Sequence, residues 1–215
     1  MAPEPEPLIV NHKVCGHADL SPCGATKLVH AVKACIDAPL RSDLATDLLD
    51  LTRAILDSVG FNLAQALTAF GPCIQQWCPI MLEDEILGGC DYPVLEPVNA
   101  QDGPKNPVIW LSIWLVLRKP CSLDEDMGES ELYTALKQVH ALFQTATKLE
   151  LSLLQTGLII AVYEIGHGLR QQAFQTIGSC VATLRILELE AERKHDVENS
   201  KALVWLKASL AMVDR

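Results

Sequence analysis

The sequence predicts an all-α protein, and three observations support this fold class. Apolar residues make up 49% of the 215 residues and aromatic residues only 5%, with leucine and alanine, two good helix formers, dominant. Apolar residues recur at three- and four-residue steps from about residue 40 onward. No alternation of apolar and polar residues longer than four positions predicts a strand. We therefore expect an irregular array of several helices.

Residues 1–45 are expected to form a loosely structured N-terminal arm, followed by a helical domain over residues 46–215. Prolines alternate with acids at the start of the arm, and one short helix is predicted over 26–36. The helical pattern becomes steady from about Leu40 and continues over 61–80, where Pro79 ends it. The apolar residues of the 61–80 stretch that lie on one stripe are Leu63, Leu67, Phe70, Ile74 and Trp77.

The middle of the chain alternates loops with one very apolar segment. Glycines and prolines over 88–107 predict a loop, and Pro107 opens a helix to about Lys119, because proline is favoured at a first helical position. This helix is apolar on nearly all sides, so we expect it to be central. An acidic loop follows, in which Asp126 and Glu129 resemble a capping box.

Helices are predicted over 132–143, 151–165, 171–189 and 201–213, and a charged loop over 190–200. The inward positions of the third of these helices are predicted to be Phe174, Ile177, Val181, Leu184 and Leu187. Between the second and third lies Gly166-His167-Gly168. A glycine past a helix end can adopt the left-handed conformation and stop the helix, and the next helix can then fold back antiparallel.

Composition excludes several classes of function. Seventeen basic and 27 acidic residues give a net charge of −10, which is unsuited to binding nucleic-acid phosphates. The N-terminus has neither the basic nor the apolar region of a signal peptide, so we expect a reducing compartment. The longest apolar run, Val108–Leu117, is shorter than the roughly 18 residues that a membrane-spanning helix needs.

Metal binding and catalysis find little support in the sequence. Cys15, His17, Cys23 and His30 form the best candidate cluster for zinc, yet no C-x-x-C pair is present. Cys73, Cys78 and Cys180 lie on apolar helical stretches, where thiols are usually inert. We therefore predict no catalytic residue, no bound metal and no cofactor, with a Cys/His enzyme or a helical ligand carrier as the less favoured alternative.

One segment is similar to a known family. Residues 153–187 resemble the regulatory domain of fungal zinc-cluster transcription factors, whose pattern includes a Leu-Gln-x-Gly-Leu opening, a Tyr-Glu-x-Gly-His-Gly centre and a Thr-x-Gly-x-Cys continuation. The matching positions are Gln155, Gly157, Leu158, Tyr163, Glu164, Gly166, His167, Gly168, Ala173, Phe174, Thr176, Gly178 and Cys180. Weaker likeness extends to residues 70–80, 106–120 and 204–215.

Two departures from the family pattern shape the expected function. The spacing of Cys15, Cys23 and Cys35 does not fit the family's six-cysteine zinc cluster, and the family's helical domain continues beyond the Asp-Arg that ends this chain. The resemblance then implies a fungal transcription-regulator-like protein, in the nucleus or else the cytoplasm, that controls a secondary-metabolite or catabolic gene set. Alternatives are a stand-alone module that modulates a full-length regulator and a non-functional truncated relative.

Residues of the central motif are predicted to be structural, namely Tyr163, Glu164, Gly166, His167 and Gly168. A His167 ring nitrogen is expected to bond a carbonyl at the preceding helix end. The apolar stripes of 108–117 and of Leu203, Leu206, Leu210 and Val213 are expected to lack part of their cover. We therefore expect a protein partner or self-association, with no direct binding to nucleic acid or to a membrane.

Overall fold

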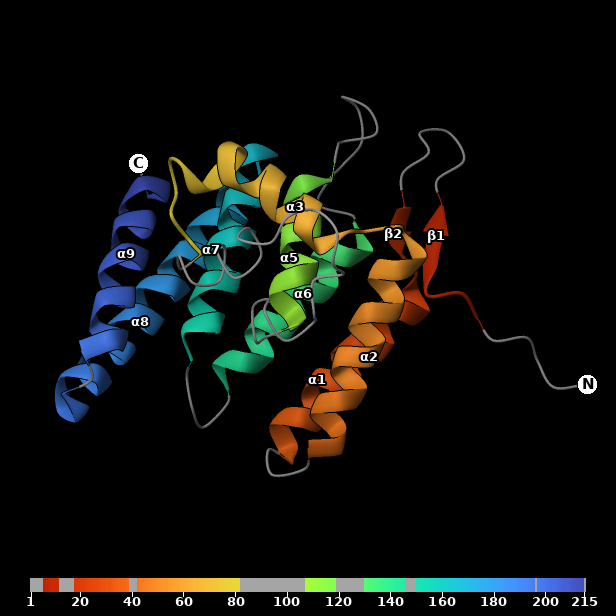
Figure 1. Cartoon of the computed structure of the whole chain (residues 1–215), viewed down its shortest axis with the longest axis horizontal. Helices are drawn as coiled ribbons and strands as arrows, with labels where there is room; N and C mark the ends of the chain where they lie inside the picture. The colour runs from red at the N-terminus through yellow and green to blue at the C-terminus, as the bar shows by residue number, and fades with distance from the viewer. Residues whose placement is uncertain are drawn as a thin grey trace, which may run out of the picture. The chain divides into compact units, whose positions relative to one another are not determined.

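A computed structural model of the chain describes residues 6–11, 18–38, 42–81, 107–118, 130–145, 150–195 and 197–214. The predicted all-α class is confirmed, because helices make up most of these residues and the described strands form one two-stranded sheet (Figure 1). The chain divides into two compact units. Unit 1 comprises Met1–Asn62 and Arg118–Thr145, and unit 2 comprises Leu63–Leu117 and Ala146–Arg215.

Unit 1 begins with a small hairpin that leads into a helix. Strand β1 (Ile9–Asn11) pairs antiparallel with β2 (Ala18–Leu20), with Ile9 opposite Leu20. Helices α1 (Pro22–Asp37), α2 (Ser42–Ser58) and α6 (Glu131–Gln144) complete the described part of the unit, and α1 packs against both others.

The first 45 residues thus contain more regular structure than the expected arm. Helix α1 is longer than the predicted 26–36 because its start is well capped. The Ser21 side chain accepts a hydrogen bond from the Gly24 amide at 3.0 Å, and Pro22 occupies the first turn, where its missing N–H costs nothing. Ser21 also donates its hydroxyl proton to the Pro7 carbonyl at 2.5 Å, which ties the segment before β1 to the start of the helix.

Unit 2 holds the remaining described helices. They are α3 (Leu63–Phe70), the π-helical turn η1 (Gly71–Gln75), α5 (Pro107–Leu117), α7 (Leu151–Gly166), α8 (Arg170–Lys194) and α9 (Val197–Val213). Helix α7 packs against α5, α8 and α9, and α3 packs against α5. As predicted, α5 is buried on nearly all sides, with residues 108–115 all buried.

The stretch over 61–80 differs from the single helix that was predicted. It changes from α3 to the wider turn η1 at Gly71, and regular helix ends at Gln75. Pro72 supplies the reason, because it has no N–H to donate to the carbonyl four residues earlier, so the α-helical ladder cannot continue through it. Trp77, predicted to share the inward stripe, is 46% exposed.

The predicted loop over 190–200 is wrong. Helix α8 runs to Lys194, one left-handed residue, His195 (φ 53°), ends it, and α9 begins at Val197. The charges that suggested a loop instead support the helix, since Lys194 pairs with Glu190 one turn earlier at 3.3 Å and basic residues suit a helix C-terminus. The predicted capping box at Asp126 and Glu129 and the loop over 88–106 lie outside the described residues.

Candidate functional site

The corner between α7 and α8 contains the five residues singled out from the sequence. The His167 amide donates to the Tyr163 carbonyl at 3.1 Å, and His167 Nδ1 lies 2.7 Å from the same oxygen. The rings of Tyr163 and His167 lie against each other, with centroids 4.1 Å apart. The ring-to-carbonyl contact is the type expected for His167, and it gives the Tyr163 carbonyl a second partner beside the His167 amide.

The left-handed residue of this corner is Gly168, with φ at +72°, whereas Gly166 is the last residue of α7. The Leu169 amide donates to the Glu164 carbonyl at 2.8 Å, which closes the turn. The side chains of Tyr163 and Glu164 are buried in unit 2. A structural role for Tyr163, Glu164, Gly166, His167 and Gly168 stays a prediction, because the contacts show how the corner is built but not what each residue contributes.

The cysteine and histidine candidates are scattered. Cys23 and His30 lie on α1, while Cys15 and His17 fall outside the described residues. Within the described ranges, no three His, Cys, Asp or Glu side chains come together as a metal site would require. Burial raises the pKa of the Cys78 thiol to about 11, so this group is a protonated thiol at neutral pH and a poor nucleophile.

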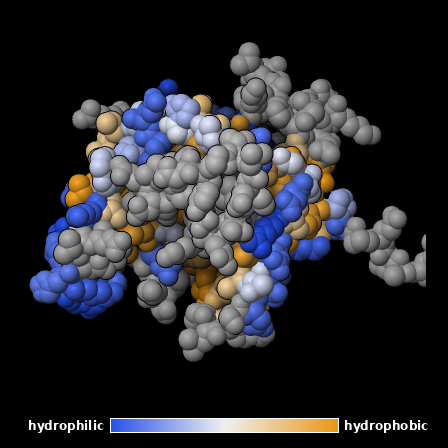
Figure 2. Space-filling view, in the orientation of Figure 1, coloured by the Kyte–Doolittle hydropathy of each residue, from blue (hydrophilic) through white to orange (hydrophobic). Residues whose placement is uncertain are grey.

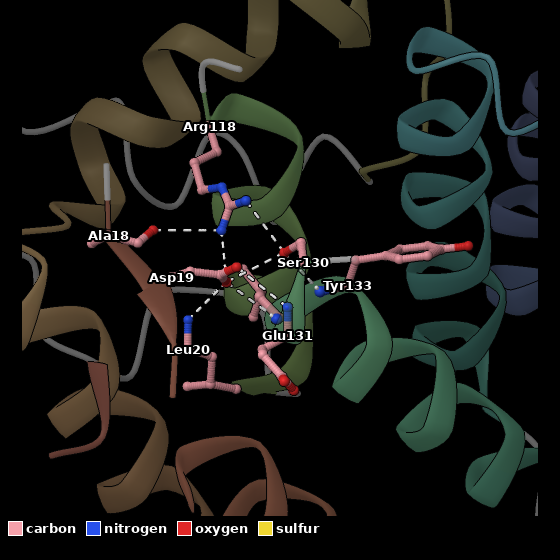
Figure 3. Close-up of polar contacts among 8 residues, drawn as sticks. Ala18, Asp19, Leu20, Arg118, Ser130, Glu131 and Tyr133 are labelled. Atoms are coloured by element: carbon pink, nitrogen blue, oxygen red, sulfur yellow. Dashed lines mark hydrogen bonds and ion pairs between the residues drawn. The ribbon is translucent and has the colours of Figure 1, made fainter. Parts of the chain in front are cut away.

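A buried polar cluster in unit 1 was not predicted from the sequence. Arg118 Nη1 lies 2.7 Å from Asp19 Oδ1, and both side chains are nearly buried. Asp19 also accepts the Glu131 and Leu132 amides at 3.3 and 3.2 Å, while the Ser130 hydroxyl accepts the Tyr133 amide. Figure 3 shows the Asp19 carboxylate between Arg118 and the start of α6. The carboxylate caps α6 from β2, where a negative charge also suits the helix dipole.

This cluster has the geometry of a structural contact that joins β2 to the start of α6. All its charged and polar groups satisfy one another: Arg118 also donates to the Ala18 carbonyl at 3.4 Å and to the Ser130 hydroxyl at 3.2 Å. The Asp19 carboxylate is occupied by donors of the protein itself, so the cluster offers no free group to a substrate.

Helix α9 has two apolar faces, and one of them is exposed. Its inner face packs against α7 and α8 through five side chains, namely Ala202, Leu203, Leu206, Leu210 and Val213. The expectation that this leucine stripe and the 108–117 stripe lack cover is wrong, because unit 2 buries the leucine stripe and residues 108–115, and residues 116–117 are half-buried. The outer face exposes Val204 (67%), Trp205 (56%), Ala208, Ala211 and Met212.

A second segment adjoins α9. The Ser209 hydroxyl donates to the Pro79 carbonyl at 2.7 Å, and the Cys78 thiol donates to the Ser209 carbonyl at 3.8 Å. These bonds hold residues 78–79 beside the buried Ser209 of α9, and the exposed Trp77 precedes them with its indole N–H bonded to the Cys73 carbonyl at 2.8 Å. We call Val204, Trp205, Ala208, Ala211 and Met212 the α9 surface.

The space-filling view agrees with this assignment. Figure 2 shows hydrophobic residues at the surface in the region of α9, interspersed with hydrophilic ones. The neighbouring helix α8 also departs from the prediction, because Phe174 (78% exposed) and Val181, predicted inward, point to solvent. No helix among the described residues is long and apolar enough to cross a bilayer.

Comparison with curated proteins gives one informative similarity. Over 63 residues the chain is 40% identical to "Transcription factor BOA15" of Botryotinia fuckeliana (strain B05.10). The match covers 29% of this chain and 35% of the relative, so the chain spans about a third of the length of the relative it matches. Comparisons with known protein families and with solved structures find no match. The chain therefore contains a region related to a fungal transcription factor.

Proposed function

We propose that this protein regulates transcription through contacts with another protein, without catalysis and without binding DNA directly. It acts in the nucleus, with the cytoplasm as the alternative, and its targets are a secondary-metabolite or catabolic gene set. The similarity to a fungal transcription factor supports the regulatory role, and the net charge of −10 disfavours contacts with phosphates.

The observation that carries the mechanism is the α9 surface. Trp205 is 56% exposed, and Val204 and Met212 on the same helix face are 67% and 53% exposed, so large apolar side chains face water here. Tryptophan is the residue type most enriched among those that dominate protein interfaces. Soluble proteins seldom expose a contiguous apolar patch beyond a few hundred Å² without using it for binding. The α9 surface is therefore the part of unit 2 that we assign to a partner.

A reporter assay tests the regulatory role. The full chain is fused to an unrelated DNA-binding domain and expressed in a fungal host with a reporter gene that carries the matching operator. We expect the fusion to change reporter output several-fold, and Trp205→Glu to remove the change. Phe174→Glu is the matched control, because it places the same charge at an exposed aromatic position of α8.

The outcomes separate cleanly when protein levels of all fusions are matched by immunoblot. A wild-type fusion that leaves the reporter unchanged contradicts the regulatory role. A change that survives Trp205→Glu as well as it survives Phe174→Glu contradicts the role of the α9 surface. A gel-shift with promoter DNA, with and without a full-length transcription factor, then distinguishes direct DNA binding from modulation of another regulator.

A further inference from the structure

The turn between α8 and α9 contains a backbone conformation that L-residues seldom adopt. Its first residue, His195, has φ at 53° and is the single non-glycine with a positive φ among the described residues. The other described positions with a positive φ, Gly60 and Gly168, are glycines, which adopt this conformation without a clash from a Cβ. The α8–α9 turn is therefore strained, whereas the α7–α8 corner is not.

The sequence around this turn favours a helix that continues through it. Neither glycine nor proline occurs between residues 179 and 213, and only residues 195–196 separate α8 from α9. Lys194 pairs with Glu190 one turn earlier, and in a straight helix it would also have Glu198 one turn later. A right-handed conformation at this turn would relieve the strain and join α8 and α9 into one continuous helix of about 66 Å.

The inner face of α9 would lose its neighbours in such a straight helix. In the observed hairpin, α9 packs on α7 and α8 and buries Leu203, Leu206 and Leu210, and hydrogen bonds join residues 78–79 to Ser209. Straightening would carry these groups away from their own chain. Every copy of the chain has the same complementary surface on α7 and α8, so a second copy can supply the same contacts, which is the basis of domain swapping.

We propose that two copies of this chain exchange α9 and form a dimer, in which α8 and α9 of each copy make one continuous helix. Helix α9 of each copy then lies along α8 of the other and remakes the contacts of the hairpin, including the one between Lys207 and Glu188 at 2.9 Å. The exchanged dimer differs from the hairpin mainly at the turn, where it lacks the left-handed His195. This inference goes beyond the proposed function and does not depend on it.

Two substitutions at His195 should move the equilibrium between monomer and dimer in opposite directions. His195→Gly removes the strain from the hairpin and weakens a continuous helix, so the dissociation constant of the dimer should rise at least about 10-fold. His195→Ala keeps the strain and favours a helix, so this constant should fall about 3-fold or more. Sedimentation velocity of the full chain over about 1–500 µM measures both, in about 0.3 M salt that screens the net charge of −10.

A proline at the start of α9 distinguishes the hairpin from the continuous helix. Val197→Pro places proline at the first residue of α9, where the hairpin tolerates it, but it removes an N–H that a continuous helix needs. This variant should remain a monomer at every concentration. Val197→Ala retains the N–H and is the matched control, which should dimerise as the wild type does. Circular dichroism melts verify that every variant is folded, and His195→Gly should melt above the wild type.

Charge reversal at the Glu188–Lys207 contact shows whether α9 crosses between copies. Glu188→Lys and Lys207→Glu each place like charges at this contact, but an exchanged dimer of one copy of each pairs opposite charges at both contacts. The two variants are refolded together from urea, with one isotopically labelled. Native mass spectrometry should find more heterodimer than both homodimers combined. Asp57→Lys and Lys33→Glu, at exposed positions of α2 and α1, carry the same net charges and should pair at random.

Three results would overturn the proposal. A monomer for both the wild type and His195→Ala at the highest concentration would show that the chain does not exchange α9. Equal dissociation constants for His195→Gly, His195→Ala and the wild type would place the dimer interface elsewhere. Heterodimer no more abundant than in the control mixture would show that α9 stays with its own chain. An exchanged dimer formed by a chain that leaves the reporter silent would contradict the proposed function alone.

Discussion

Helices α5 and α9 both carry large apolar side chains on more than one face, but their surroundings differ. Helix α5 is buried on almost every side, whereas the outer face of α9, which also has charged residues such as Lys201 and Lys207, leaves Val204, Trp205 and Met212 open to water. A helix that is apolar all round is normally covered all round, as α5 is. The comparison shows that α9 exposes side chains of the kind that α5 buries, and this exposure favours a binding surface.

The sharpest test of this comparison replaces one tryptophan in each helix. Trp114 of α5 is 7% exposed and Trp205 of α9 is 56% exposed. We expect Trp114→Ala to lower the free energy of unfolding by about 4 kcal/mol, and Trp205→Ala by less than about 0.5 kcal/mol. Urea denaturation followed by circular dichroism measures both. Similar losses in the two variants would mean that Trp205 is covered in the isolated protein.

The contrast between buried and exposed side chains also holds for ion pairs, and it predicts the next largest effect on stability. Asp19 and Arg118 form a nearly buried pair, whereas Arg53 and Asp50 form an exposed one at 3.8 Å. Asp19→Asn should cost about 3 kcal/mol, because it leaves the Arg118 charge without its partner. Asp50→Asn, the matched control, should cost less than about 0.5 kcal/mol.

An Asp19→Asn variant that unfolds at the same urea concentration as Asp50→Asn would show that water screens the Asp19–Arg118 pair. Far-ultraviolet circular dichroism provides a second reading, because loss of the cap should reduce helix content in α6 as well as stability.

Two glycines provide the third test, because replacing them by alanine should change the stability of the protein in opposite directions. Gly168 has φ at +72°, whereas Gly178 lies within α8 with open space where a Cβ would stand. Gly168→Ala should cost about 1 kcal/mol because an L-residue is strained there. Gly178→Ala should stabilise by roughly 0.5–1 kcal/mol through helix propensity. Thermal melting checks both, and a stabilising Gly168→Ala would contradict the structure of the corner.

The sequence predicted what depends on local pattern. The burial of α5, the extent of α7 and the end of α7 at the glycine corner follow from apolar spacing, proline and glycine. It could not predict which apolar face of a helix finds a neighbour, so Phe174 was placed inside although it is exposed.

Contacts between residues far apart in the chain also could not be predicted from the sequence. Asp19 and Ser130 are 111 positions apart, and their local bonds, from the Leu20 and Tyr133 amides, do not indicate this contact. The charged run over 190–200 was read as a loop because charge alone does not distinguish a solvated helix from a coil. In the same way, the α9 surface required coordinates, since Val204 and Leu203 are equally apolar in the sequence.

The smallest expected effect concerns the ion pairs that flank the α9 surface. Hydrogen bonding from Lys207, aided by Arg185, lowers the pKa of Glu188, so this carboxylate adds stability above its unfolded pKa and loses that contribution as the pH falls through the folded value. Exposed pairs contribute little, and Glu188→Gln should cost less than about 0.5 kcal/mol near neutral pH. The difference from wild type should disappear as the pH falls through the lowered pKa of Glu188, because the protonated carboxyl no longer forms the ion pair, and it should shrink in about 0.5 M salt. Urea denaturation at several pH values measures this difference in the free energy of unfolding.

If Glu188→Gln lowers the free energy of unfolding by more than about 1 kcal/mol, and if this loss persists in high salt, the Glu188–Lys207 pair is shielded from water. The exposed face of α9 would then be narrower than its exposed side chains indicate.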